Sequence, residues 1–201
     1  MTSAPPHSTP EATAATTAAG LRALRVLGLD LSMTATGICL PDGTTRTIKT
    51  NSKNGDRRLQ TIVNEVGLAL GESTDDCGDA CDLVVMEEAP PGLKGPAIKA
   101  IHMVHGAVRL RLLDFDTPYV VINPTTLKAY ATGSTSADKT AMAMAAYKRS
   151  GREFADDNQC DAWWLRAAGL DACGTPEFEL PKAQRERLAK VAWPGLAAVT
   201  R

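Results

Sequence analysis

Acidic residues mark three segments that lie far apart in the chain. Asp30 and Glu87 each end a short apolar run that reads as a buried strand, and Asp161 lies in the stretch 156–165, which reads as a helix. An unpaired carboxylate beside an apolar core is costly, so acids at three such places indicate a shared site for divalent cations. The chemistry that this pattern predicts is metal-assisted.

The elements that must position these acids form a mixed sheet. Pro41, Asp42 and Gly43 have the chemistry of a hairpin turn, and strands alternate with helices after residue 55. This order predicts an α/β fold, a mixed five-stranded sheet flanked by helices. The predicted strands cover 24–31, the residues leading to 40, 44–50, 83–87 and 118–122, and the predicted helices cover 55–70, 97–113, 125–130, 138–148 and 157–168.

In such a sheet the first and fourth strands can be parallel neighbours, so Asp30 and Glu87 would emerge side by side. Asp157 and Asp161, spaced i and i+4, would share one face of a helix that crosses this edge, and Asn158 with Asp161 fits equally well. Carboxylates placed in this way could hold two magnesium ions about 4 Å apart, an arrangement that hydrolyses phosphodiesters.

Four motifs follow one another between residues 24 and 170. They are Asp30-Leu31-Ser32 with Thr36-Gly37, the strand that ends in Glu87, Pro124 with Lys128 and Lys139 eleven residues apart, and the helix that carries Asp161-Ala162. In this order and at these separations they resemble the RuvC-like Holliday junction resolvases of the ribonuclease H-like superfamily, particularly versions carried by bacteriophages. The resemblance implies a ribonuclease H-like fold and cleavage of branched DNA.

The resemblance also implies the metal ligands. Asp30, Glu87 and Asp161 would bind Mg²⁺, for which Mn²⁺ is expected to substitute. The family usually places a fourth acid three residues before the last one, where this chain has Asn158. We therefore name Asp157 as the predicted fourth ligand, although an Asn can also offer a carbonyl oxygen to a hard cation.

The neighbours of these acids have separate expected roles. Lys128 and Lys139 match family lysines near the scissile phosphate, where a cation offsets developing negative charge; without the motif they would read as solvated charges. Glu88 should point to the opposite side of its strand from Glu87, so we interpret it as structural. Trp163 and Trp164 are predicted to pack in the core rather than to stack on bases.

Charge is unevenly distributed along the 201 residues. The net charge is −1, but nine Lys or Arg residues and three Asp residues lie between positions 92 and 152, which makes that segment +6 and the remainder −7. A basic stretch between acidic segments suits a protein that binds a polyanion. A solvated helical surface fits the charge equally well.

Length and composition predict a single domain. They also predict a cytoplasmic location, which would be the host cytoplasm if a phage encodes the chain. No apolar run approaches the roughly 18 residues of a membrane span, and five cysteines, an odd number, favour reduced thiols. Residues 1–22, rich in Ala, Thr, Ser and Pro, are predicted to be a disordered tail. We predict a nuclease domain over 23–173 and a C-terminal extension over 174–201, with one helix at 182–191.

Three functions remain open from the sequence. The first is a magnesium-dependent endonuclease that resolves Holliday junctions and related branched DNA in recombination, repair and replication. Since a four-way junction has twofold symmetry, such an enzyme is expected to be a homodimer. The second is an actin-like or sugar-kinase-type ATPase, but the chain is too short for two such domains. The third is a non-catalytic module that binds branched DNA and has lost a ligand at Asn158.

Overall fold

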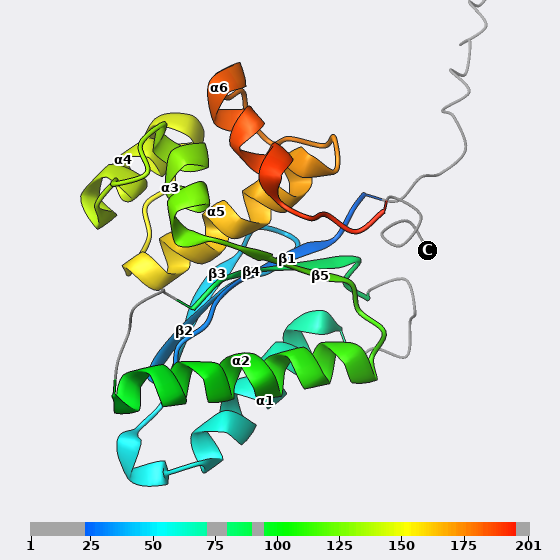
Figure 1. The fold of residues 1–201 in the computed structure, drawn as a ribbon, viewed down its shortest axis with the longest axis vertical. Helices are drawn as coiled ribbons and strands as arrows, with labels where there is room; N and C mark the ends of the chain where they lie inside the picture. Colours follow the sequence, from blue (N-terminus) through cyan, green and yellow to red (C-terminus); the bar gives the residue numbers. More distant parts are fainter. Residues whose placement is uncertain (1–22, 72–79, 90–94, 196–201) are drawn as a thin grey trace, which may run out of the picture.

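A computed structural model of the chain describes residues 23–71, 80–89 and 95–195. One sheet contains β1 (Val26–Asp30), β2 (Ala35–Cys39), β3 (Thr45–Lys49), β4 (Leu83–Glu87) and β5 (Tyr119–Ile122), in the order β3-β2-β1-β4-β5 (Figure 1). β1 is antiparallel to β2, and β2 to β3, whereas β1, β4 and β5 run parallel. The predicted mixed five-stranded sheet is therefore confirmed.

Helices cover both faces of this sheet (Figure 1). α1 (Arg57–Leu70) and α2 (Pro96–Asp114) lie on one face, and a 3-10 turn, η1 (Ser52–Asn54), precedes α1. The other face carries α3 (Pro124–Thr132), α4 (Lys139–Ser150), α5 (Asp157–Ala172), α6 (Lys182–Arg185) and the 3-10 helix η3 (Glu186–Lys190). The core is accordingly divided into two hydrophobic clusters, one on each side of the sheet.

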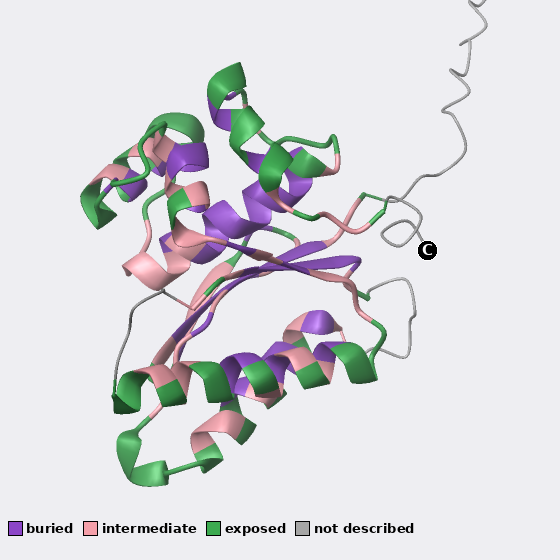
Figure 2. Cartoon of the chain, viewed as in Figure 1, coloured by how far each residue is buried: buried purple, intermediate pink, exposed green. Residues whose placement is uncertain are grey.

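α5 is the central helix of its layer and is buried along most of its length (Figure 2). Trp163 and Trp164 are 2% and 0% exposed, and the Trp164 indole N–H donates to the carbonyl oxygen of Met142 at 3.2 Å. The predicted core role of both tryptophans is confirmed.

The segment that follows residue 174 packs on this same helix. The ring of Phe178 stacks on that of Trp163 with centroids 5.3 Å apart, and Leu180 and Leu188 are buried in the cluster around α5. The helix predicted over 182–191 is present as one α-helical turn, α6, followed directly by the 3-10 helix η3. The domain division at 174 stays a prediction, and the tail predicted over 1–22 lies outside the described residues.

No helix in the described part of the chain is long and apolar enough to span a membrane. Four cysteines of that part are free thiols: Cys39, Cys81, Cys160 and Cys173.

Candidate active site

Asp30 is the last residue of β1, and its side chain lies on the face of the sheet that α5 covers. Side chains alternate along a strand, so Val26, Gly28 and Asp30 share one side. Val26 belongs to the hydrophobic cluster around α5, whereas Leu27 and Leu29 belong to the cluster around α1 and α2. Asp30 thus emerges beneath α5, at the carboxyl end of β1.

Glu87 ends β4 on the same side of the sheet. β1 and β4 are parallel with Leu29 opposite Met86, so Asp30 and Glu87 occupy the next positions of adjacent strands. Val85, two residues before Glu87, packs in the cluster around α5. The strand pairing that was predicted for these two acids is confirmed.

Two glycines allow α5 to lie directly on β1 and β2. A Cβ atom at Gly28 would come 2.0 Å from the carbonyl oxygen of Ala162, and one at Gly37 would come 2.0 Å from the carbonyl oxygen of Asn158. Only glycine fits at such a close approach of two backbones. Because Asp30 pairs with Gly37, the first two turns of α5 cross beside Asp30.

Asp161 lies in these turns, and its charge reaches both strand acids. Burial, and after it the charge of Asp161, raises the pKa of Asp30 to about 7. Burial, and then the charges of Asp30 and Asp161, raise the pKa of Glu87 to about 8. Burial raises the pKa of Asp161 itself to about 6. We call Asp30, Glu87 and Asp161 the carboxylate cluster, whose acids ionise reluctantly unless a cation joins them.

Both predicted lysines act on this cluster. Lys139, the first residue of α4, forms an ion pair with the Asp157 carboxylate, and its charge opposes the raised pKa of Asp30 and of Asp161. Lys128 in α3 does the same for Glu87 and Asp161. Positive charge therefore borders the cluster from two separate helices.

Asp156, at the start of α5, is an acid that sequence reasoning did not single out. It is the N-cap of the helix and accepts hydrogen bonds from the Gln159 N–H at 3.0 Å and the Thr47 hydroxyl at 2.7 Å. Burial acts to raise the pKa of Asp156, but these hydrogen bonds outweigh it, and the pKa lies below its usual range. The charge of Asp156 also raises the pKa of Asp30.

The identity of the fourth ligand stays a prediction, and Asp156 joins Asp157 and Asn158 as a candidate. Asp157, the residue predicted from the sequence, is half-buried and paired with Lys139. Asn158 places its backbone against Gly37. Cap geometry was the signal that could have drawn attention to Asp156, because an Asp followed three residues later by Gln is a helix-start pattern.

Glu88 points away from the carboxylate cluster, as predicted. It is exposed, its carboxylate accepts a hydrogen bond from the Asn123 amide at 3.3 Å, and its charge acts on His105 of α2, the helix on the opposite face. Glu88 is therefore not placed to share a cation with Glu87.

The carboxylate cluster fits a magnesium site by its donor chemistry. Mg²⁺ prefers carboxylate oxygens, and burial raises the pKa of all three acids, so a bound cation would favour their ionised forms. Among the described residues, however, no group of three or more His, Cys, Asp or Glu side chains stands ready to hold a metal ion. The roles of these acids as ligands stay a prediction.

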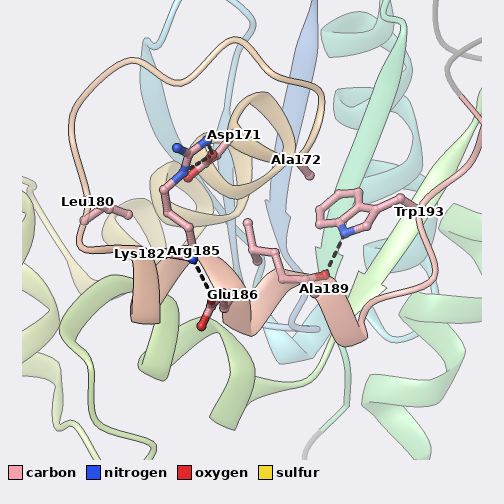
Figure 3. A pocket seen from close by; sticks show the side chains of 9 residues that line it. Asp171, Ala172, Leu180, Lys182, Arg185, Glu186, Ala189 and Trp193 are labelled. Carbon is pink, nitrogen blue, oxygen red and sulfur yellow. Dashed lines mark hydrogen bonds and ion pairs between the residues drawn. The ribbon is translucent and has the colours of Figure 1, made fainter.

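A separate hollow of about 410 Å³ lies at the far end of α5 (Figure 3). Its wall includes Leu180, Leu188 and Trp193, and the Arg185 guanidinium donates from Nε to the buried Asp171 carboxylate at 2.8 Å. This ion pair ties α6 to α5, and neither the carboxylate cluster nor the two lysines line the hollow.

The sheet order and the helix lying across β1 and β2 define a ribonuclease H-like α/β fold. Solved structures of RuvC from Thermus thermophilus are similar to this chain. One RuvC structure superposes with a TM-score of 0.60 at 18% identity, covering 76% of this chain and 98% of that one. RuvC in complex with a Holliday junction substrate gives a TM-score of 0.62 at 19% identity, with the same coverage. No family model and no curated protein sequence matches the chain.

Proposed function

We propose that this chain is a magnesium-dependent endonuclease that resolves Holliday junctions and related branched DNA in recombination and repair. The observation that carries the proposal is the carboxylate cluster of acids from β1, β4 and α5. Burial raises the pKa of all three acids, and the charge of Asp161 raises those of Asp30 and Glu87 further. The shared fold with a protein whose structure contains a Holliday junction supports the same substrate. The four free thiols in the described part of the chain are consistent with a cytoplasmic location.

Each group has a separate task in this proposal. Asp30, Glu87 and Asp161 would hold Mg²⁺, or Mn²⁺ in its place, together with an acid from the first turn of α5. Bound metal would supply an activated water and stabilise the leaving oxygen. Lys128 and Lys139 offset the negative charge that develops on the phosphate, because both already act electrostatically on the cluster.

The test is cleavage of an end-labelled four-way junction with Mg²⁺, with Mn²⁺ and with a chelator. Asp30→Asn keeps the size of the side chain but removes its charge. Asp56→Asn is the matched control, because Asp56 is exposed and its side chain makes no capping hydrogen bond. We expect metal-dependent cutting by the parent protein and by Asp56→Asn, and a loss of at least about 10³-fold in Asp30→Asn.

A non-catalytic module would behave differently in the same assay. It would bind the junction without yielding any product at any metal concentration, and Asp30→Asn would leave binding unchanged. That outcome would overturn the endonuclease and favour the binding module.

A homodimer is part of the proposal, and the outer face of α2 supports it. Met103, Leu110 and Leu113 on this face are 42%, 61% and 64% exposed, and Gly106 between them has nothing within 4 Å of where a Cβ would lie. The spacing of 3, 4 and 3 residues makes one stripe, as in paired helices. A glycine inside an exposed helix costs about 1 kcal/mol relative to alanine, and it permits another helix to approach closely.

The charges at the two ends of α2 fit a second copy of this chain. Lys99 and Asp114 are both exposed, near the first and last turns. Two α2 helices that cross antiparallel at Gly106 would bring Lys99 of each copy beside Asp114 of the other. Such reciprocal contacts are what a twofold interface requires. We propose that this face joins the two subunits.

A further inference from the structure

β3, an edge strand, presents a row of side chains to the start of α5. Thr45 and Thr47 form hydrogen bonds with the side chains of Gln159 and Asp156, at 3.1 Å and 2.7 Å. Lys49 is two residues beyond Thr47, so the alternation of the strand places its side chain on this same face. Lys49 therefore borders the first turn of α5.

Lys49 also lies at the end of the sheet that holds the carboxylate cluster. The strand register pairs Lys49 with Ala35 and pairs Gly37 with Asp30, so β2 alone separates Lys49 from the catalytic end of β1. The charge of Lys49 lowers the pKa of Asp156, which places it within electrostatic reach of the helix N-terminus.

The two basic residues of β3 have different surroundings. Arg46 points to the opposite face, where its guanidinium pairs with Glu65 of α1 at 2.5 Å. Lys49 is exposed, and no acid in the described part of the chain forms an ion pair with it. A lysine on an edge strand often has no other role than to discourage pairing with another sheet. That role could be filled anywhere along β3, whereas Lys49 lies at the end of the strand beside the start of α5.

Lys49 and Lys139 both border the first turn of α5, from two different elements. Lys139 approaches from α4 and pairs with Asp157, and Lys49 approaches from β3. A phosphodiester backbone carries one negative charge per nucleotide, so a strand that crosses this turn could contact both lysines.

We propose that Lys49 binds a backbone phosphate next to the scissile one, so that the cut strand passes over the start of α5 between Lys49 and Lys139. This inference rests on the proposed function and adds to it a DNA-binding residue and the course of the strand. Lys49 is a positioning residue in this arrangement, because it holds the DNA and does not touch the reacting atoms.

The test measures junction binding as a function of salt in the Asp30→Asn background, which is not expected to cut. Lys49→Ala should weaken binding roughly threefold and reduce the slope of log K against log salt by about 0.9, the value for one lost phosphate contact on duplex DNA. Lys49→Arg should restore both quantities. Lys190→Ala is the matched control, because Lys190 is also exposed but lies in η3, at the opposite end of α5 (Figure 1).

In the cleaving protein, Lys49→Ala should raise KM more than it lowers kcat. Lys49→Gln, which keeps most of the aliphatic side chain, replaces the alanine variant if that variant melts at a lower temperature. An unchanged affinity and salt slope in a variant whose parent binds junctions would overturn the role of Lys49 and leave the endonuclease intact. A parent that neither binds nor cuts junctions would overturn the proposed function and this inference together.

Discussion

Asp30 and Glu87 link the candidate site to the stability of the protein. The folded-state pKa of Asp30, about 7, lies above its usual value of 3.8, and that of Glu87, about 8, lies above 4.5. The stability that such groups contribute is fully present below about pH 4 and is lost as pH rises through these folded-state values. Without a cation, the protein should therefore be less stable at pH 8 than at pH 5.

The first prediction uses Asp30→Asn to remove one of these charges. In a chelator at pH 8 the variant should be more stable than the parent by about 1 kcal/mol or more, since one pKa unit corresponds to about 1.4 kcal/mol. At pH 5 the gain should be much smaller, because the parent carboxyl group is then largely protonated. Denaturant unfolding at both pH values measures the difference, with Asp56→Asn as the control. An equal effect at pH 5 and pH 8 would contradict the assigned cause.

A second residue-scale prediction separates the candidate fourth ligands. Asn is as good an N-cap as Asp, so Asp156→Asn should leave α5 intact while it removes a charge near Asp30. Asp157→Asn removes the partner of Lys139 instead. The variant that lacks the true ligand should require roughly tenfold or more Mg²⁺ for half-maximal cleavage. Equal, parental magnesium requirements in both variants would leave Asn158 as the remaining donor of that turn.

At the scale of elements, the site depends on how closely α5 approaches β1 and β2. Gly28 and Gly37 are the positions at which the two backbones meet. A third prediction follows: Gly28→Ala should destabilise the fold by at least about 2 kcal/mol, because the added methyl meets backbone and not a movable side chain. Gly195→Ala, where a Cβ meets nothing within 4 Å, should be nearly neutral. Thermal unfolding of both variants gives the comparison.

The same elements show how far sequence reasoning extends. The positions of Asp30 and Glu87 at strand ends could be predicted, because each acid directly follows an apolar run in the sequence. Parallel pairing of the two strands then brings these ends together. The start of α5 was less predictable, because Asp156, Asp157 and Asn158 lie in one turn and only the capping hydrogen bond distinguishes them.

Contacts between segments that lie far apart in the sequence could not be predicted, for a different reason. Phe178 stacks on Trp163, although the Gly and Pro residues around 174–181 indicated the end of the compact domain. Lys49 gains its position from the pairing of three strands, and no local pattern records that pairing. Local periodicity predicts the elements, whereas tertiary packing decides which charged residues meet.

At the scale of the whole molecule, the proposed dimer depends on the apolar stripe along the outer face of α2. Leu110→Glu would place a charge in the middle of the apolar stripe and should give a monomer at micromolar concentration. Sedimentation velocity measures the change. A monomer that still nicks one strand of a junction but no longer cuts two strands together would connect the dimer with resolution.

The antiparallel arrangement can be tested separately from the stripe. Lys99→Glu would face Asp114 of the other subunit twice, once at each end of the interface, and should weaken the dimer by about 1 to 2 kcal/mol, roughly tenfold in dissociation constant. Asp114→Lys should do the same by facing Lys99. The double variant reverses both charges and should recover most of the parental affinity, because opposite charges meet again. Lys148→Glu on the exposed side of α4 is the control. Additive weakening in the double variant, without recovery, would show that these two residues do not meet across the interface and that the subunits pair in another way.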